Sequence, residues 1–234
     1  MTEPLVLLPD LLCDARYFGP QLAELSADYT LMTVPLGTSG RMSDLADMVL
    51  ARAPGQFGLI GAGLGGVVAM EILARAPDRL SRLALISASP LQESPFGAMA
   101  YEPMLVTARS GRLAEVVSEL FGVSEEEAEG QLLPLLQDMA TNVGLSAFVN
   151  QVRALQRHRD MQSVLRKATC PVQVICGEDD ALIPVKRHQV MTDFLTDGEL
   201  SIIPQAGHVP TLQNPEAVTQ VLRHWVSRPL QLRH

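Results

Sequence analysis

The sequence predicts an α/β domain with a doubly wound parallel sheet and a helical insertion. Short, almost wholly apolar segments bounded by Pro, Gly or Asp are typical of parallel strands that are buried on both faces. These segments alternate with segments of helical periodicity, as in folds built from strand–helix–strand units. The alternation stops between residues 91 and 167, where every pattern is helical. With 234 residues, 47% of them hydrophobic, the chain can bury the core of one large domain.

Four strands are expected in the first part of the chain, with helices between them. Ser43 is the expected N-cap of the second helix, because Asp44 and Asp47 follow it, where the helix dipole favours negative charge. Pro77 ends the third helix. The expected strands are Leu5–Leu8, Thr30–Val34, Phe57–Ile60 and Arg82–Ser87, and the expected helices are Tyr17–Leu25, Ser43–Ala53 and Gly65–Ala76.

The second part of the chain contains the insertion and two further strands, which makes about six strands in all. Ser124 and Glu127 form a capping-box signature inside the insertion. Residues 1–90 and 168–234 are therefore expected to form the core, and residues 91–167 a helical cap. The helices expected in the cap are Met99–Ala108, Leu113–Phe121, Glu125–Met139 and Leu145–Arg157; beyond it, strands Val172–Cys176 and Leu200–Ile203 alternate with helices Val185–Leu195 and Pro215–Val226.

Charge and cysteine content narrow the possible partners and the compartment. The net charge is −8 and no Lys/Arg cluster is present, which argues against a nucleic-acid partner. The run Leu5–Leu8 is too short to span a membrane, lacks the preceding basic residues of a signal peptide, and has no longer counterpart elsewhere. Cys170 and Cys176 are expected on one strand about 20 Å apart, which is beyond disulfide reach. We therefore expect reduced thiols, a cytoplasmic protein and no membrane association.

The residues that could take part in catalysis or binding lie at one edge of the expected sheet. Ligands of open parallel sheets bind at the carboxyl ends of the strands, and the cap leaves from that same edge. A small-molecule pocket is therefore expected between the two. The strand ends carry Pro9-Asp10-Leu11, Gly61 to Gly66, Ser87-Ala88-Ser89, Gly177 to Asp180 and Ala206-Gly207-His208.

A glycine-rich turn, Gly61-Ala62-Gly63-Leu64-Gly65-Gly66, follows the third strand and opens a helix. This is the context in which a G-x-S-x-G turn presents a catalytic serine. The central residue here is Gly63, which has no side chain that can attack a substrate. The turn also fits G-x-G-x-x-G, but the dinucleotide pattern follows the first strand and has an acidic residue about 20 residues later. Neither condition holds, so no nucleotide cofactor is expected.

Four segments, in order and each preceded by an expected strand, resemble those of the α/β-hydrolase fold, in particular the small bacterial members with a helical cap. The resemblance covers nearly the whole chain. It implies that Asp180 orients His208, that Leu11 and Leu64 supply the backbone N–H groups of an oxyanion hole, and that Gly63 occupies the nucleophile position. The segments are Leu7-Leu8-Pro9-Asp10-Leu11-Leu12, Gly61 to Gly66, Gly177-Glu178-Asp179-Asp180-Ala181-Leu182-Ile183-Pro184, and Ile203-Pro204-Gln205-Ala206-Gly207-His208 with Asn214-Pro215-Glu216 beyond it.

The chain departs from this family pattern at the two places that matter for acyl transfer. Gly63 replaces the nucleophile, and Ala62 precedes it where His is common. Asp10 stands where the family usually has Gly, and a carboxylate that pointed inward would repel the charge developing in an oxyanion hole. Serine esterase activity is therefore expected to be weak or absent. Asp179 is an alternative partner for His208, because the two aspartates are adjacent.

Other side chains near this edge have simpler interpretations. Cys13 lies close to the first turn, and a thiolate is an able nucleophile, but a packed small apolar residue is favoured. Ser87 and Ser89 are expected to line the pocket or form a turn. His158 and His188 lie on expected helices without metal-ligand spacing, so no metal is expected.

Two functions are consistent with these residues. The first is a small-molecule enzyme in which an Asp180–His208 dyad acts as general base; the resemblance implies a small, largely apolar ester, lactone, ketone or aromatic substrate. The second is a non-catalytic ligand-binding or sensing protein, which Asp10 and Gly63 favour. Gly63→Ser is expected to raise ester hydrolysis and lower stability. Neither function needs a cofactor, and a monomer or weak homodimer is expected.

Overall fold

Six parallel strands form one sheet in the computed structural model, which describes residues 3–123 and 129–229. The strand order is β2-β1-β3-β4-β5-β6, and every neighbouring pair is parallel. The fold class predicted from the sequence is confirmed. The strands are β1 (Leu5–Leu8), β2 (Leu31–Thr33), β3 (Phe57–Ala62), β4 (Leu80–Ile86), β5 (Val172–Gly177) and β6 (Gly198–Ile203).

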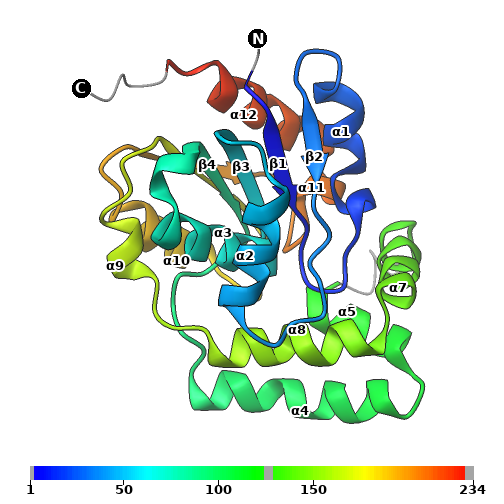
Figure 1. Cartoon of the computed structure of the whole chain (residues 1–234). Coiled ribbons are helices and arrows are strands. Elements are labelled where there is room, and N and C mark those ends of the chain that lie inside the picture. The colour runs from blue at the N-terminus through cyan, green and yellow to red at the C-terminus, as the bar shows by residue number, and fades with distance from the viewer. Residues whose placement is uncertain (1–2, 124–128, 230–234) are drawn as a thin grey trace.

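Helices cover both faces of this sheet (Figure 1). Short 3-10 helices, at Ala15–Phe18 and Pro77–Arg79, precede α1 and β4. The last helix, α12, is amphipathic, and Trp225 on its apolar face is fully buried. One face carries α2 (Met42–Arg52), α3 (Leu64–Arg75) and α9 (Gln162–Leu165), the other carries α1 (Gly19–Leu25), α11 (Pro210–Gln213) and α12 (Pro215–Ser227), and α10 (Val185–Thr192) packs on β5 and β6.

The segment between β4 and β5 adds helices that lie beyond the carboxyl edge of the sheet (Figure 1). The helix expected at Leu145–Arg157 has those bounds, whereas the start of the expected helix Glu125–Met139 and its capping box lie outside the described residues. No single described helix is long and apolar enough to cross a membrane; α7 and α8 would pass only as a pair, and they are bent by 96°. The helices are α4 (Pro95–Arg109), a 3-10 turn (Leu113–Val116), α5 (Val117–Phe121), α7 (Leu132–Val143) and α8 (Leu145–Arg157).

The expected N-cap of α2 is wrong. The helix begins at Met42, and Arg41 occupies the cap position without a side-chain hydrogen bond. Ser43 lies inside the helix, where its Oγ donates to Asp44 Oδ1 at 3.1 Å. Burial of Met42 against the core outweighs the capping preference that the sequence pattern indicated.

The strand order reverses between β1 and β3, so the ends of these two strands meet at the topological switch point where open sheets bind ligands. Leu8 is in register with Gly61. The first turn of α3 packs backbone to backbone against both strand ends, since a Cβ on Gly65 would lie 2.2 Å from the Leu8 carbonyl oxygen. This contact brings Asp10 and Gly63 side by side.

Gly65→Ala is predicted to lower the free energy of unfolding by about 1–3 kcal/mol, because the added methyl group forces β1 and α3 apart. Gly19→Ala is the matched control, since no atom lies within 4 Å of its Cβ position and its φ of −47° suits alanine. Urea denaturation measures both variants. Equal destabilisation by the two substitutions would contradict the close approach at Gly65.

Candidate active site

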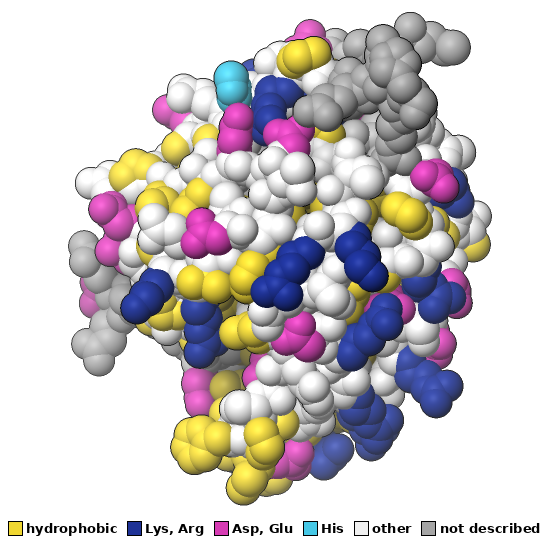
Figure 2. Space-filling model, turned by 90° about the vertical axis from the view of Figure 1, so that its left-hand side faces the viewer, with side chains coloured by type: hydrophobic (Ala, Val, Ile, Leu, Met, Phe, Trp, Pro, Cys, Tyr) yellow, Lys and Arg dark blue, Asp and Glu magenta, His cyan; other side chains and the backbone are white. Residues whose placement is uncertain are grey.

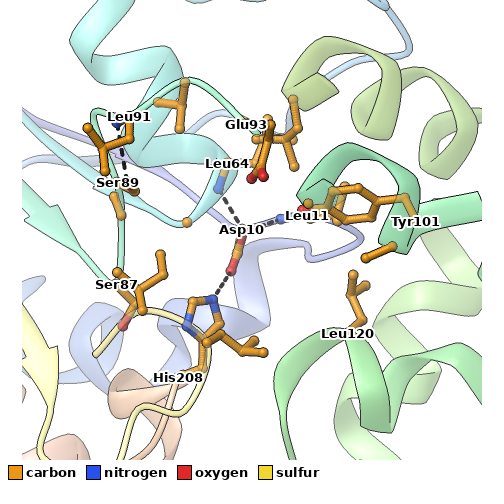
Figure 3. Close-up of a pocket in the computed structure, with 18 of the residues that line it drawn as sticks. Asp10, Leu11, Leu64, Ser87, Ser89, Leu91, Glu93, Tyr101, Leu120 and His208 are labelled. Carbon is orange, nitrogen blue, oxygen red and sulfur yellow. Dashed lines mark hydrogen bonds and ion pairs between the residues drawn. The ribbon is translucent and has the colours of Figure 1, made fainter. Parts of the chain in front are cut away.

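The Asp10 side chain points into the switch point rather than away from it (Figure 3). Its Oδ1 accepts two backbone N–H groups, from Leu11 at 2.6 Å and from Leu64 at 2.7 Å. The residue is 4% exposed. Leu64 is the first residue of α3, so the helix dipole adds to the attraction. The two N–H groups that the resemblance assigned to an oxyanion hole therefore hold the carboxylate of Asp10.

Gly63 is the residue that leaves room for this carboxylate. Its backbone has φ +47° and ψ −115°, a conformation that residues with a side chain rarely adopt. A Cβ at this position would lie 1.9 to 2.1 Å from the three carboxylate atoms of Asp10. The space that the resemblance assigns to a nucleophilic side chain, and that was expected to be vacant, is therefore filled by the side chain of Asp10 from the neighbouring strand end.

His208 lies on the other side of this carboxylate and is held by Asp180. Its Nδ1 lies 2.9 Å from Asp180 Oδ2, while Asp180 Oδ1 accepts the N–H groups of Leu182 and Ile183, both at 2.9 Å. Both oxygens of Asp180 are thus fixed, which fixes the orientation of the imidazole. The partner of His208 is Asp180, and the alternative Asp179 is exposed.

The second carboxylate that faces the imidazole is that of Asp10. Its Oδ2 lies 3.6 Å from His208 Nε2, longer than a hydrogen bond but within an ion pair. Burial lowers the pKa of His208, but the two flanking carboxylates outweigh burial and raise that pKa to about 9. Burial likewise raises the pKa of Asp180, yet His208 and the two N–H groups hold it below its usual value. The two carboxylates therefore favour a protonated imidazole at neutral pH.

Two glutamines that the sequence analysis did not select support this geometry. Gln213 Oε1 accepts the N–H groups of Gly207 and Val209, at 2.9 and 3.0 Å, and so fixes the loop on both sides of His208. Gln151 of α8 is buried, and its Oε1 accepts the N–H of Leu12 at 3.0 Å. Both contacts join residues that no short sequence motif connects, so only the fold reveals them.

A cavity of about 500 Å³ opens above these groups. Ser87 lines it as expected, with φ +45° and a buried Oγ that forms no hydrogen bond among the described residues. His158, which the sequence treated as an ordinary helical residue, follows α8 and also lines it. From the sheet edge come Asp10, Gly63 and His208, and from the inserted helices Tyr101, Met104 and Leu120 (Figure 3).

Of the remaining candidates, Ser89 lines the cavity as expected and Cys13 does not. Cys13 is buried and unbonded, and burial followed by the charges of Asp10 and Asp14 raises its thiol pKa well above 9, so it stays protonated. Ser89 Oγ accepts the N–H of Leu91 at 3.2 Å in a turn. Within residues 3–123 and 129–229, no three His, Cys, Asp or Glu side chains are arranged to hold a metal ion.

Comparison with known proteins places this site in a family. The pattern of the alpha/beta hydrolase family matches residues 5–221. The chain belongs to that family. A pimeloyl-[acyl-carrier protein] methyl ester esterase from Pectobacterium carotovorum is 26% identical over 236 residues, covering 92% of this chain and 91% of the relative. A putative carbamate hydrolase from Yersinia enterocolitica is 25% identical, covering 94% and 86%.

Solved structures agree with this assignment at the level of the fold. The enol-lactonase of Burkholderia xenovorans LB400 superposes with a TM-score of 0.87 at 18% identity, covering 97% of this chain and 92% of that one. A thermophilic esterase from Thermogutta terrifontis gives a TM-score of 0.85 at 21% identity, covering 97% and 90%. These similarities concern the scaffold.

Introducing serine at position 63 alone is predicted not to raise ester hydrolysis, contrary to the expectation from the sequence. The serine Cβ would collide with the Asp10 carboxylate, so Gly63→Ser should destabilise the protein without raising ester hydrolysis. The double variant Asp10→Gly/Gly63→Ser removes the collision and frees both N–H groups, and it should hydrolyse p-nitrophenyl acetate and butyrate. An equal gain in the single variant would show that Asp10 does not occupy this space.

The charge of His208 is predicted to depend on Asp10. Nuclear magnetic resonance titration of the imidazole should give a pKa of about 9 in the wild-type protein and a lower value in Asp10→Asn. Because the folded pKa lies above the usual 6.5, the stabilisation from this charge is complete below pH 6.5 and is lost as the pH rises through 9. Urea denaturation should therefore show a loss of stability over that range that is absent in His208→Gln; an unchanged pKa in Asp10→Asn would refute the coupling.

Proposed function

We propose that this protein is a small-molecule hydrolase that works without a serine nucleophile, with His208 and Asp180 as its acid–base pair. The observation that carries the proposal is the 2.9 Å contact between His208 Nδ1 and Asp180 Oδ2, which leaves Nε2 directed toward Asp10 at the base of the cavity. A scaffold that had lost all chemistry would have no need of a fully oriented imidazole there. General acid–base catalysis by such a group contributes about 10²–10⁴-fold to a rate.

The walls of the cavity support a small and largely apolar substrate. Leu64, Val67, Met104, Leu120 and Phe121 contribute apolar surface beside the polar strand ends. The names of the relatives refer to a methyl ester and a carbamate, and that of a structural neighbour to an enol lactone. A small ester, lactone, ketone or aromatic compound is accordingly the class that we propose to test, and its turnover needs neither a metal nor an organic cofactor.

We further propose, from the sequence, a cytoplasmic location, a monomer or weak homodimer, and a helical cap formed by residues 91–167. Tyr101, Met104 and Leu120 of this cap line the same cavity as His208. A cap in this position would exclude water from the acid–base pair and so strengthen its electrostatic interactions.

A second candidate function is ligand binding without catalysis, and one observation favours it. Asp10 holds both N–H groups that a conventional ester substrate would need for its carbonyl oxygen. If Asp10 never leaves this position, an acyl group cannot be stabilised there. The cavity would then bind a small apolar ligand as a sensor.

Substitutions in the acid–base pair decide between the two functions. His208→Gln and Asp180→Asn are predicted to lower turnover by about 10²–10⁴-fold while ligand binding persists. Asp179→Asn is the matched control, because Asp179 is adjacent to Asp180 yet exposed and out of the site. Turnover of a panel of esters, lactones, epoxides and ketones and calorimetric binding provide the readouts. Retained turnover in His208→Gln would contradict the role of the acid–base pair, whereas ligand binding with no turnover in the wild-type protein would favour the sensing protein.

A further inference from the structure

The two oxygens of Asp10 lie in different surroundings. Oδ1 accepts the N–H groups of Leu11 and Leu64, whereas Oδ2 accepts no backbone N–H and lies 3.6 Å from His208 Nε2 (Figure 3). The carboxylate lines the cavity and occupies the space of the side chain that Gly63 lacks. One oxygen is therefore held as a carbonyl oxygen would be, and the other is directed toward the place where a substrate binds.

We propose that Asp10 is the nucleophile of this protein, and that its Oδ2 attacks a saturated carbon of a small apolar epoxide to form an alkyl ester on the enzyme. The inference rests on the proposed function, since it uses His208 and Asp180 as the acid–base pair. It adds the attacking atom, and it replaces the ester, lactone, ketone or aromatic substrate proposed above with another small apolar class, the strained cyclic ethers.

The first step needs only the Asp10 carboxylate, the epoxide and the proton on His208. A bond forms between Asp10 Oδ2 and the epoxide carbon, the carbon–oxygen bond of the ring breaks, and the ring oxygen takes the proton of His208 Nε2. Esterification removes the negative charge of Asp10, which is one of the two charges that keep His208 protonated. The imidazole that remains is neutral and is a competent base for the next step.

The second step regenerates the enzyme with one water molecule. Neutral His208 takes a proton from water as the water oxygen attacks Cγ of Asp10, and the N–H groups of Leu11 and Leu64 stabilise the negative charge on Oδ1. The Cγ–Oδ2 bond then breaks, and the departing alkoxide takes the proton of His208 to give a vicinal diol. Asp10 keeps the water oxygen and returns its remaining proton to His208.

This assignment accounts for every contact of Asp10, which the competing mechanisms do not. If Asp10 were a general base, the two N–H groups that hold its Oδ1 would have no role in the reaction. If an ester carbonyl were attacked, its oxyanion would find both N–H groups already occupied. An oxygen leaving group needs a proton, which the protonated His208 supplies, and this favours an epoxide over an alkyl halide.

Isotope labelling tests the inference on the full-length protein. The enzyme, in excess over styrene oxide or 1,2-epoxyhexane, completes a single turnover in H₂¹⁸O, and mass spectrometry locates the label. We expect one ¹⁸O on Asp10 in the tryptic peptide that ends at Arg16, and an unlabelled new hydroxyl in the diol. Asp10→Asn, whose amide oxygen can still accept both N–H groups, should lose at least about 1,000-fold in diol formation. His208→Gln should lose diol formation and form no alkylated Asp10, because the acid of the first step and the base of the second step are both missing.

Each outcome separates this inference from the proposed function. Diol formation with ¹⁸O in the diol and none on Asp10 would overturn the nucleophile but retain a hydrolase in which His208 activates water. Turnover of esters but not epoxides, still dependent on His208, would overturn the substrate class and the nucleophile together. Absence of epoxide turnover, with no ¹⁸O on Asp10, in the wild-type protein would refute the inference. Absence of hydrolysis of every compound in the panel would refute the proposed function as well.

Discussion

The contact on which the site depends is the one between the Asp10 carboxylate and the two backbone N–H groups at the start of α3. A buried carboxylate is costly unless donors and a positive charge compensate it. Leu11 and Leu64 provide the donors at 2.6 and 2.7 Å, and protonated His208 provides the charge. The same N–H groups would themselves be unsatisfied without an acceptor. Carboxylate and helix terminus therefore stabilise each other, and Gly63 is the residue that makes their approach sterically possible.

The raised pKa of His208 also depends on the Asp10 carboxylate held by this contact. A serine hydroxyl is uncharged and leaves its histidine neutral, ready to accept a proton. Here two carboxylates, Asp10 and Asp180, face one imidazole from opposite ring nitrogens, and together they raise its pKa to about 9. Protonated His208 must therefore donate a proton before its imidazole can act as a base. A reaction that starts with proton donation fits this state, and one that starts with proton removal does not.

Much of this arrangement could be predicted from the sequence, because it follows from local pattern. The six strands and the helical insertion follow from hydrophobic periodicity. Asp180 and His208 follow from the resemblance of the segments after β5 and β6 to those of the α/β-hydrolase fold. The direction of the Asp10 side chain could not be predicted, since it depends on the Leu8–Gly61 register and on a turn in which Leu12 has φ +57°. Gln151 and Gln213 were missed for the same reason: each fixes a backbone segment that is distant in sequence or carries no motif.

The register of β1 and β3 also allows side chains from two different chain positions, 10 and 63, to occupy the same space. Because the ends of the two strands adjoin, the space beside the two N–H groups can be filled from residue 63 or from residue 10, but not from both. The two positions are therefore coupled: a side chain at 63 excludes Asp10, and glycine at both would leave the N–H groups without a protein acceptor. Coupling of this kind predicts strongly non-additive effects of substitution. Considered alone, Gly63 suggests that a side chain has been lost from the site. Considered together with Asp10, it indicates one site in which a carboxylate occupies the space beside the two N–H groups.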